Sequence, residues 1–184
     1  SGDILVKKYL KIDINTRIAN IYKWISEMVP VVFLEAVNKL KKNNDYILCR
    51  QSEVNVNPLR CFPRLGVDGK IDWRLDAMSI LRLINASSEP YSGAYTYKNG
   101  EKVVIWRAKI FEYNYDFLGI PGQIAMKLES GGVVVICKNS MIEIEEVEVD
   151  GHRDRASLFF HSVRERFSYE CYYFSSWGSS YSKF

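Results

Sequence analysis

Residues 64–108, RLGVDGKIDWRLDAMSILRLINASSEPYSGAYTYKNGEKVVIWRA, separate two kinds of sequence. Before this stretch the apolar residues fall mainly at helical spacing, and after it they come in short runs typical of strands. Within it, an Asp68-Gly69 turn precedes Ile71 and Trp73, a short amphipathic segment follows, and Asn99-Gly100 is a strong hairpin signal. The sequence therefore predicts an α+β chain that changes character at this hinge.

The bulk composition is that of a globular protein. The chain has 184 residues, of which 47% are hydrophobic and 26% charged, enough for one large domain or two small ones. No run approaches the ~20 apolar residues of a membrane span. The N-terminal SGDILVKKYL lacks the apolar core of a signal peptide. We expect a cytoplasmic protein without a membrane segment, and a chain that begins with Ser is expected to be a fragment or a processed product.

Cysteine spacing and charge distribution exclude two classes of site. Cys49, Cys61, Cys137 and Cys171 form no CxxC pair, so we expect reduced thiols and no metal site. The formal net charge is +3, with 14 Lys and Arg against 9 Asp and Glu in residues 1–86. Residues 87–184 carry 11 basic against 13 acidic residues. Binding to a polyanion needs clustered Lys and Arg, so the second half is not expected to bind one.

The first part of the chain is expected to be mostly helical. A capping signal at Asn15-Thr16 predicts a helix that ends near Met28, and Pro30 predicts the start of a second helix. The expected elements are a strand over 4–10, these two helices over about 16–28 and 31–42, and a short strand over 52–56. The polar residues on either side of the short strand over 52–56 are expected to form a connector.

The second part predicts one helix and then several strands. Asp72 or Asp76 is expected to cap a helix over 77–86 whose inward face carries Met78, Leu81 and either Leu83 or Ile84. Strands are expected over 94–97, 102–108, 123–128, 133–137 and 141–149, with a closing helix over 156–166 and an aromatic, Ser-rich tail over 169–184. Such closely spaced strands suggest a small antiparallel barrel.

The sequence contains no common catalytic motif. GxSxG, HExxH and a Walker loop are all missing from it. His161, Ser162 and Glu165 could imitate a triad, but adjacent residues on a helix do not face each other. Four aromatic residues near the hinge either line a pocket or form an aromatic core, and the sequence leaves both readings open: Trp73, Tyr91, Tyr95 and Trp106.

Five short segments in order resemble one known family. They are Gly2-Asp3-Ile4-Leu5, Ile71-Asp72-Trp73, Pro90-Tyr91-Ser92-Gly93-Ala94, Trp106-Arg107-Ala108 and Pro121-Gly122-Gln123-Ile124. Together they resemble the formyltransferases that use 10-formyltetrahydrofolate, over residues 1 to about 166. Two positions depart from the family pattern: Asn85 stands where Arg is usual, and Ser92 where Pro is usual. Either change could alter a substrate contact or only a hinge hydrogen bond.

The resemblance implies an architecture and a missing part. Residues 1–86 would be the C-terminal portion of a Rossmann-like formyltransferase domain with its hinge, and residues 87–184 a small OB-like β-barrel with an aromatic tail. The family's catalytic Asn and His have no counterpart here, and its catalytic Asp would immediately precede Ser1. We therefore assign no catalytic residue and expect this chain to be inactive on its own.

The resemblance also implies ligands and partners. Gly2 and Asp3 would lie beside the cofactor 10-formyltetrahydrofolate, and Arg64, Trp73 and Tyr91 would contact the acceptor, since Arg binds phosphate and aromatic rings stack on bases. The slightly acidic second half favours an amino-sugar nucleotide as acceptor over initiator methionyl-tRNA. Other possibilities are a non-catalytic binding module of the same fold, a homodimer, and contact with a missing N-terminal half.

Overall fold

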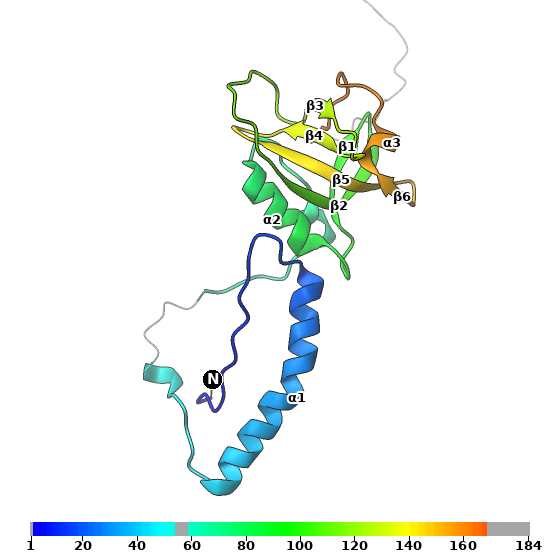
Figure 1. Cartoon of the computed structure of the whole chain (residues 1–184). Coiled ribbons are helices and arrows are strands. Elements are labelled where there is room, and N and C mark those ends of the chain that lie inside the picture. The colour runs from blue at the N-terminus through cyan, green and yellow to red at the C-terminus, as the bar shows by residue number, and fades with distance from the viewer. Residues whose placement is uncertain (1, 54–58, 169–184) are drawn as a thin grey trace, which may run out of the picture. The chain divides into compact units, whose positions relative to one another are not determined.

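A computed structural model of the chain describes residues 2–53 and 59–168 (Figure 1). It divides into two compact units, Ser1–Leu65 (unit 1) and Gly66–Phe184 (unit 2). None of the helices in the described ranges combines the length and apolarity that crossing a membrane requires. The predicted short strand over 52–56 falls largely on undescribed residues, and the aromatic tail over 169–184 falls outside the described residues altogether.

Unit 1 contains one long helix, α1, over Ile18–Lys42, with Pro30 inside it. The prediction of two helices that meet at Pro30 was wrong. A proline removes only its own N–H from the helical ladder, so the turns on either side can continue, although at a cost of about 3 kcal/mol. The helix begins where the Asn20 side chain accepts a hydrogen bond from the backbone N–H of Arg17, with a donor–acceptor distance of 3.0 Å.

The predicted strand over 4–10 does not form. Only Ile4 pairs, in an isolated antiparallel bridge to Cys49, where the Ile4 N–H donates to the Cys49 carbonyl at 2.9 Å. A strand needs a partner along its length to satisfy its backbone groups. After this bridge the chain forms a short 3-10 helix, η1, over Gln51–Glu53.

Unit 2 opens with the 3-10 helix η2 over Gly66–Gly69 and the helix α2 over Ala77–Ser87. Of the two predicted caps, Asp72 and Asp76, the structure has Asp76: its carboxylate accepts hydrogen bonds from the Ser79 N–H at 2.9 Å and the Ser79 hydroxyl at 2.8 Å. The buried stripe of α2 consists of Ala77, Ile80, Leu81 and Ile84. Met78, predicted to face inward, is exposed because it lies one position, or 100°, off that stripe.

Six strands form one antiparallel sheet in unit 2 (Figure 1). They are β1 Ala94–Lys98, β2 Glu101–Phe111, β3 Ile124–Lys127, β4 Val133–Ile136, β5 Met141–Val149 and β6 His152–Arg155. The order is β1-β2-β5-β4-β3, and β6 pairs with β5 beyond the end of β4. Five of these strands match the prediction. The sixth, β6, was not predicted because all four of its residues are exposed.

The predicted barrel is not confirmed, since the path of named strands from β1 to β3 is open. An extended segment, residues 165–168, hydrogen-bonds to both edges instead. The Ser168 N–H donates to the Tyr97 carbonyl at 2.8 Å, and the Phe167 N–H donates to the Gly122 carbonyl at 2.8 Å. The predicted closing helix over 156–166 is therefore mostly wrong: only Ala156–Phe159, α3, is helical. Extended backbone allows this segment to complete the hydrogen bonds of two sheet edges, which a helix could not do.

The core of unit 2 lies between the sheet and the elements on its inner face. Val103 and Ile105 of β2 alternate inward and are fully buried, as are Ile144 and Val147 of β5. The helix α2 packs against β1, β2 and β5 on this face (Figure 1). A register shift near Arg107 interrupts the pairing of β2 with β5. The core thus holds β2, β5 and β6 in position. The turn between α2 and β1 lies next to the outer face of these strands.

Candidate functional site

The turn between α2 and β1, residues 89–92, is an exposed part of the hinge. The Tyr91 N–H donates to the Ser88 carbonyl at 3.1 Å, and the Gly93 N–H donates to the Ser87 carbonyl at 2.9 Å. Gly93 has a φ of +80°, and a Cβ atom there would collide with the Val104 side chain. Only glycine fits this combination of backbone angle and close approach. The turn is therefore held rigidly against β2.

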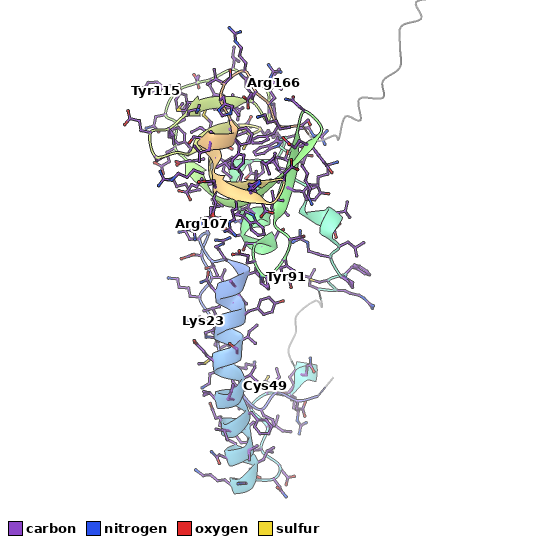
Figure 2. All side chains as sticks on the ribbon, turned by 90° about the vertical axis from the view of Figure 1, so that its right-hand side faces the viewer. Lys23, Cys49, Tyr91, Arg107, Tyr115 and Arg166 are labelled. Atoms are coloured by element: carbon purple, nitrogen blue, oxygen red, sulfur yellow. The ribbon has the colours of Figure 1, made fainter. Side chains whose placement is uncertain are left out.

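Tyr91 is the exposed aromatic side chain of this turn. Its exposed fraction is 51%, and Figure 2 places it at one end of unit 2, away from Tyr115 and Arg166 at the other end. Because the turn is rigid, an exposed ring on it can stack on a planar ligand without the entropic cost of ordering a loop. The exposure of Tyr91 is compatible with the predicted acceptor contact, which stays a prediction.

Arg153 of β6 fastens the turn to the sheet. Its guanidinium bonds to the Glu89 carboxylate at 2.6 Å and to the Glu146 carboxylate at 2.7 Å. The same guanidinium lies 4.7 Å from the ring centre of Trp106, at cation–π distance. Glu146, and then Glu89, raise the pKa of Arg153 above its ordinary value. The Arg153 guanidinium thus links Glu89 of the turn to Glu146 and Trp106 of the sheet.

Trp106 packs against the turn. It is 7% exposed, its indole N–H donates to the Glu148 carboxylate at 2.8 Å, and its ring lies beside Gly93. The sequence did not predict the ion pairs of Arg153 with Glu89 and Glu146 or the hydrogen bond of Trp106 to Glu148. The sequence signal for these contacts was the series of acidic residues in β5, which pairs with the arginines of β6. In the register, Glu148 lies opposite Arg153.

Trp73 is packed inside unit 2. Only 3% of it is exposed, its indole N–H donates to the Thr96 hydroxyl at 2.9 Å, and its ring stacks on Phe167 with centroids 5.1 Å apart. The structure thus supports the aromatic-core reading for Trp73 and Trp106. A contact of Trp73 with the acceptor stays a prediction, and this packing gives it no support.

The remaining predicted site residues belong to unit 1, so the structure does not bring them together with Tyr91 in a defined geometry. The Asp3 carboxylate accepts a hydrogen bond from the Gln51 backbone N–H at 3.1 Å, and Gly2 and Arg64 are exposed. Asp3 therefore serves to fasten the chain near η1. These residues alone do not form a site that fits a folate, and their cofactor and acceptor contacts stay predictions. Among the described residues no His, Cys, Asp and Glu cluster could hold a metal ion.

The residues that imitate a triad in the sequence have other partners. Glu165 accepts a hydrogen bond from the backbone N–H of His161 at 3.1 Å and pairs with Lys98 at 2.8 Å. Burial raises the pKa of Glu165, but Lys98 and the backbone N–H groups of His161 and Ser162 outweigh it, so the net shift is downward. Glu165 thus contacts the Lys98 ammonium and the backbone of His161, which is not the carboxylate–imidazole hydrogen bond of a catalytic triad.

Ion pairs neutralise much of the positive charge of the sheet. The Lys109 ammonium lies 3.1 Å from the buried Glu143 carboxylate and 2.9 Å from that of Glu145. Arg107 pairs with Glu146 at 3.2 Å. The basic side chains of the sheet in such pairs are Lys98, Arg107, Lys109 and Arg153. The outer face of the sheet thus carries mixed charge.

Comparison with known proteins gives a family and several relatives. The profile described as "Formyl transferase, C-terminal domain" matches residues 67–162. The chain is 26% identical over 163 residues to the methionyl-tRNA formyltransferase of Prochlorococcus marinus subsp. pastoris, covering 83% of this chain and 50% of that protein. It is 25% identical over 151 residues to the bifunctional polymyxin resistance protein ArnA of Wigglesworthia glossinidia brevipalpis, covering 78% of this chain and 20% of that protein.

A solved structure shares the fold. HypX from Aquifex aeolicus, in complex with tetrahydrofolic acid, matches 88% of this chain and 28% of its own length, with a TM-score of 0.60 and 20% identity. The chain thus spans half or less of the proteins it resembles.

Proposed function

The chain belongs to the formyl transferase family through its C-terminal domain, and we propose that it forms part of an enzyme that moves a formyl group to an amino group. The donor is 10-formyltetrahydrofolate, and the preferred acceptor is a nucleotide-linked amino sugar. The similarity to HypX, whose structure holds tetrahydrofolic acid, supports a folate donor. Gly2 and Asp3 would lie beside the folate, and the rest of its site is expected in formyltransferase sequence that this chain does not match.

The pairing of charges on the sheet is the observation that carries the choice of acceptor. A surface that binds tRNA uses Lys and Arg to neutralise several phosphates. In unit 2, Arg107, Lys109 and Arg153 lie within 3.3 Å of carboxylates instead. An acceptor with one diphosphate needs few cations and one stacking surface, for which Tyr91 is suited.

The acceptor contact can be tested on the 184-residue chain. We expect Tyr91→Ala to weaken binding of an amino-sugar nucleotide by about tenfold, since loss of one base–aromatic stack costs ~1–3 kcal/mol. The matched control is Tyr115→Ala, because Tyr115 is also an exposed tyrosine and lies at the opposite end of unit 2 (Figure 2). Isothermal titration calorimetry measures the affinity of each variant for the amino-sugar nucleotide. Equal affinities of Tyr91→Ala and Tyr115→Ala would show that Tyr91 does not contact the acceptor.

The second candidate acceptor is initiator methionyl-tRNA, which the names of the Prochlorococcus marinus enzyme and of similar relatives favour. Salt separates the two candidates. Binding of tRNA should weaken with a slope of ~0.7–0.9 in log affinity against log salt for each phosphate contacted. Fluorescence anisotropy with labelled tRNA between low and physiological salt measures that slope. Tight, steeply salt-dependent binding, without competition by amino-sugar nucleotides, would replace our preferred acceptor with tRNA.

The chain by itself is expected to transfer no formyl group, because the resemblance to the family places none of the catalytic Asn, His and Asp among these 184 residues. An assay with 10-formyltetrahydrofolate and each acceptor should give the blank rate. Turnover by the purified chain would show that its own residues carry the reaction. A non-catalytic binding module of the same fold is the remaining alternative, and it predicts acceptor binding without transfer even when the other part of the enzyme is supplied.

A further inference from the structure

The loop between β2 and β3 presents apolar side chains to solvent. Leu118 is fully exposed, and Tyr113, Tyr115 and Ile120 are each at least 41% exposed. Single exposed apolar residues are normal on a protein surface, but several gathered in one short loop mark an interaction site. We call Tyr113, Tyr115, Leu118 and Ile120 the loop patch. Figure 2 places Tyr115 at the same end of unit 2 as Arg166.

The loop patch is anchored to the core of unit 2. The Tyr113 ring meets the rings of Tyr115 and Phe117 edge-on, with centroids 5.7 and 6.1 Å apart. Phe117 in turn packs against a buried cluster that includes Ile136. Gly119 approaches the Ile136 side chain so closely that a Cβ atom there would collide with it. The loop patch is therefore preformed, and a ligand would bind it without the entropic cost of ordering the loop.

The last described segment of the chain runs toward the loop patch. Arg166 forms an antiparallel bridge with Gln123, and the Phe167 N–H donates to the Gly122 carbonyl at 2.8 Å. Along an antiparallel pair, one residue number rises as the opposite one falls. The direction of the chain at this bridge therefore leads from Gly122 toward Ile120, which is one end of the loop patch.

The sequence that follows is rich in aromatic residues. Residues 169–184 read YECYYFSSWGSSYSKF, in which seven of 16 residues are aromatic and only Glu170 and Lys183 are charged. A segment of this length can span ~50 Å when extended, more than the ~30 Å diameter of a small domain, so it can reach the whole loop patch. Because it belongs to the same chain, its effective concentration at the loop patch is on the order of mM. A contact within one chain is therefore favoured over a contact with a second copy.

We propose that residues 169–184 dock their aromatic side chains on the loop patch of the same chain. Docking would place these rings against Tyr113 and Tyr115, in the edge-on or offset arrangements that aromatic pairs prefer, and it would cover Leu118 and Ile120. The matched family profile ends at residue 162, so the proposed contact adds to the domain that the profile describes. Docking involves neither the reaction nor the acceptor, and it is independent of the proposed function.

The test uses the 184-residue chain and the fluorescence of Trp177, obtained as the difference between each protein and its Trp177→Phe counterpart. We expect acrylamide to quench Trp177 several-fold less than it quenches the tryptophan of a synthetic peptide of residues 169–184, because docking shields the indole from solvent. Leu118→Asp should restore the quenching seen in the peptide, since it places a charge in an apolar contact. The matched control is Leu158→Asp, at an exposed leucine of α3 in the same unit, which should leave the shielding unchanged.

A second variant and a dilution series complete the test. Tyr115→Ser should also expose Trp177 to the quencher. Both patch variants should keep the circular dichroism spectrum of the wild type, because Leu118 and Tyr115 are exposed. Shielding of Trp177 that does not change on dilution would support a contact within one chain, whose effective concentration is independent of the protein concentration.

Three results would overturn the proposal. One is quenching of Trp177 as strong as in the peptide, and another is an equal effect of Leu118→Asp and Leu158→Asp. The third is shielding that is lost on dilution together with a dimer in light scattering, which would make a second copy the occupant of the loop patch. Formyl transfer is assayed separately, so each of these results leaves the proposed function standing.

Discussion

Unit 2 buries an apolar core between its sheet and α2, whereas the long helix of unit 1 contains no buried residue. Both units are rich in apolar side chains, so composition does not explain the difference. What differs is the number of elements that meet: six strands and a helix enclose a volume, and a single helix with connecting segments cannot. A unit with its own core can in principle fold alone, and among the described residues only unit 2 has one.

The largest expected effect separates the two units directly. Ile144→Ala in unit 2 should lower the free energy of unfolding by about 2–5 kcal/mol, because Ile144 is fully buried between β2 and β4. Phe33→Ala in unit 1 should change it by less than about 0.5 kcal/mol in the isolated chain. Urea denaturation followed by tryptophan fluorescence measures both. A cost above 1 kcal/mol, roughly, for Phe33→Ala would mean that unit 1 buries this residue on its own.

A second change should improve unit 1. Pro30→Ala restores a backbone N–H inside α1 and removes the ring, which favours the helix by up to about 3 kcal/mol. We expect stronger helical circular dichroism and slower hydrogen exchange over residues 26–34. The control is Val31→Ala, an exposed neighbour whose helix propensity changes by less than about 0.7 kcal/mol. Equal spectra for the two variants would mean that contacts, not the proline, limit α1.

A pair of glycines tests how tightly unit 2 is packed. Gly151→Ala should cost about 1–2 kcal/mol, because φ is +78° there and nothing lies within 4 Å of the new Cβ atom. Gly122→Ala has a similar φ of +87°, but its Cβ atom would approach the Phe167 carbonyl oxygen to 2.5 Å. We expect a further cost of about 1–3 kcal/mol for this clash. Thermal unfolding of the two variants compares these costs. Equal costs would show that residues 165–168 shift at little energetic cost to make room for the new Cβ atom.

The smallest expected effect concerns pH and the cap of α2. Hydrogen bonds from the backbone and hydroxyl groups of Ser79 lower the pKa of Asp76 below 3.8. A lowered pKa stabilises the fold above the unfolded pKa, and this contribution is lost as the pH falls through the folded value. Wild type should exceed Asp76→Asn in Tm by less than about 4 °C at pH 6, and the difference should shrink as the pH falls through the folded pKa of Asp76. A constant difference across this range would assign it to hydrogen-bond geometry instead of charge.

Much of unit 2 could be predicted from local pattern. Asn99-Gly100 adopts the positive φ angles of a two-residue hairpin, and the strand on either side follows. Asp76 caps α2 as expected. The errors arise where a residue's state depends on distant partners: Pro30 lies within one continuous helix, and residues 160–166 are not helical because the segment is used at the sheet edges.

In the candidate site, too, the sequence predicted the local features and missed those that depend on distant partners. The sequence identified the turn with Tyr91 through its motif, and it could not tell that Trp73 is enclosed by Thr96 and Phe167. It also could not predict that Arg153 bonds to Glu89, 64 positions away along the chain.

The sequence by itself determined the turns, the cap, most strands and the family, because each depends on residues near one another along the chain. Only the tertiary structure decided which aromatic rings are buried, which charges pair, and which unit encloses a core. Those properties depend on segments that are distant in sequence and meet only in the folded chain, as Arg153 and Glu89 do and as residues 165–168 do with both edges of the sheet.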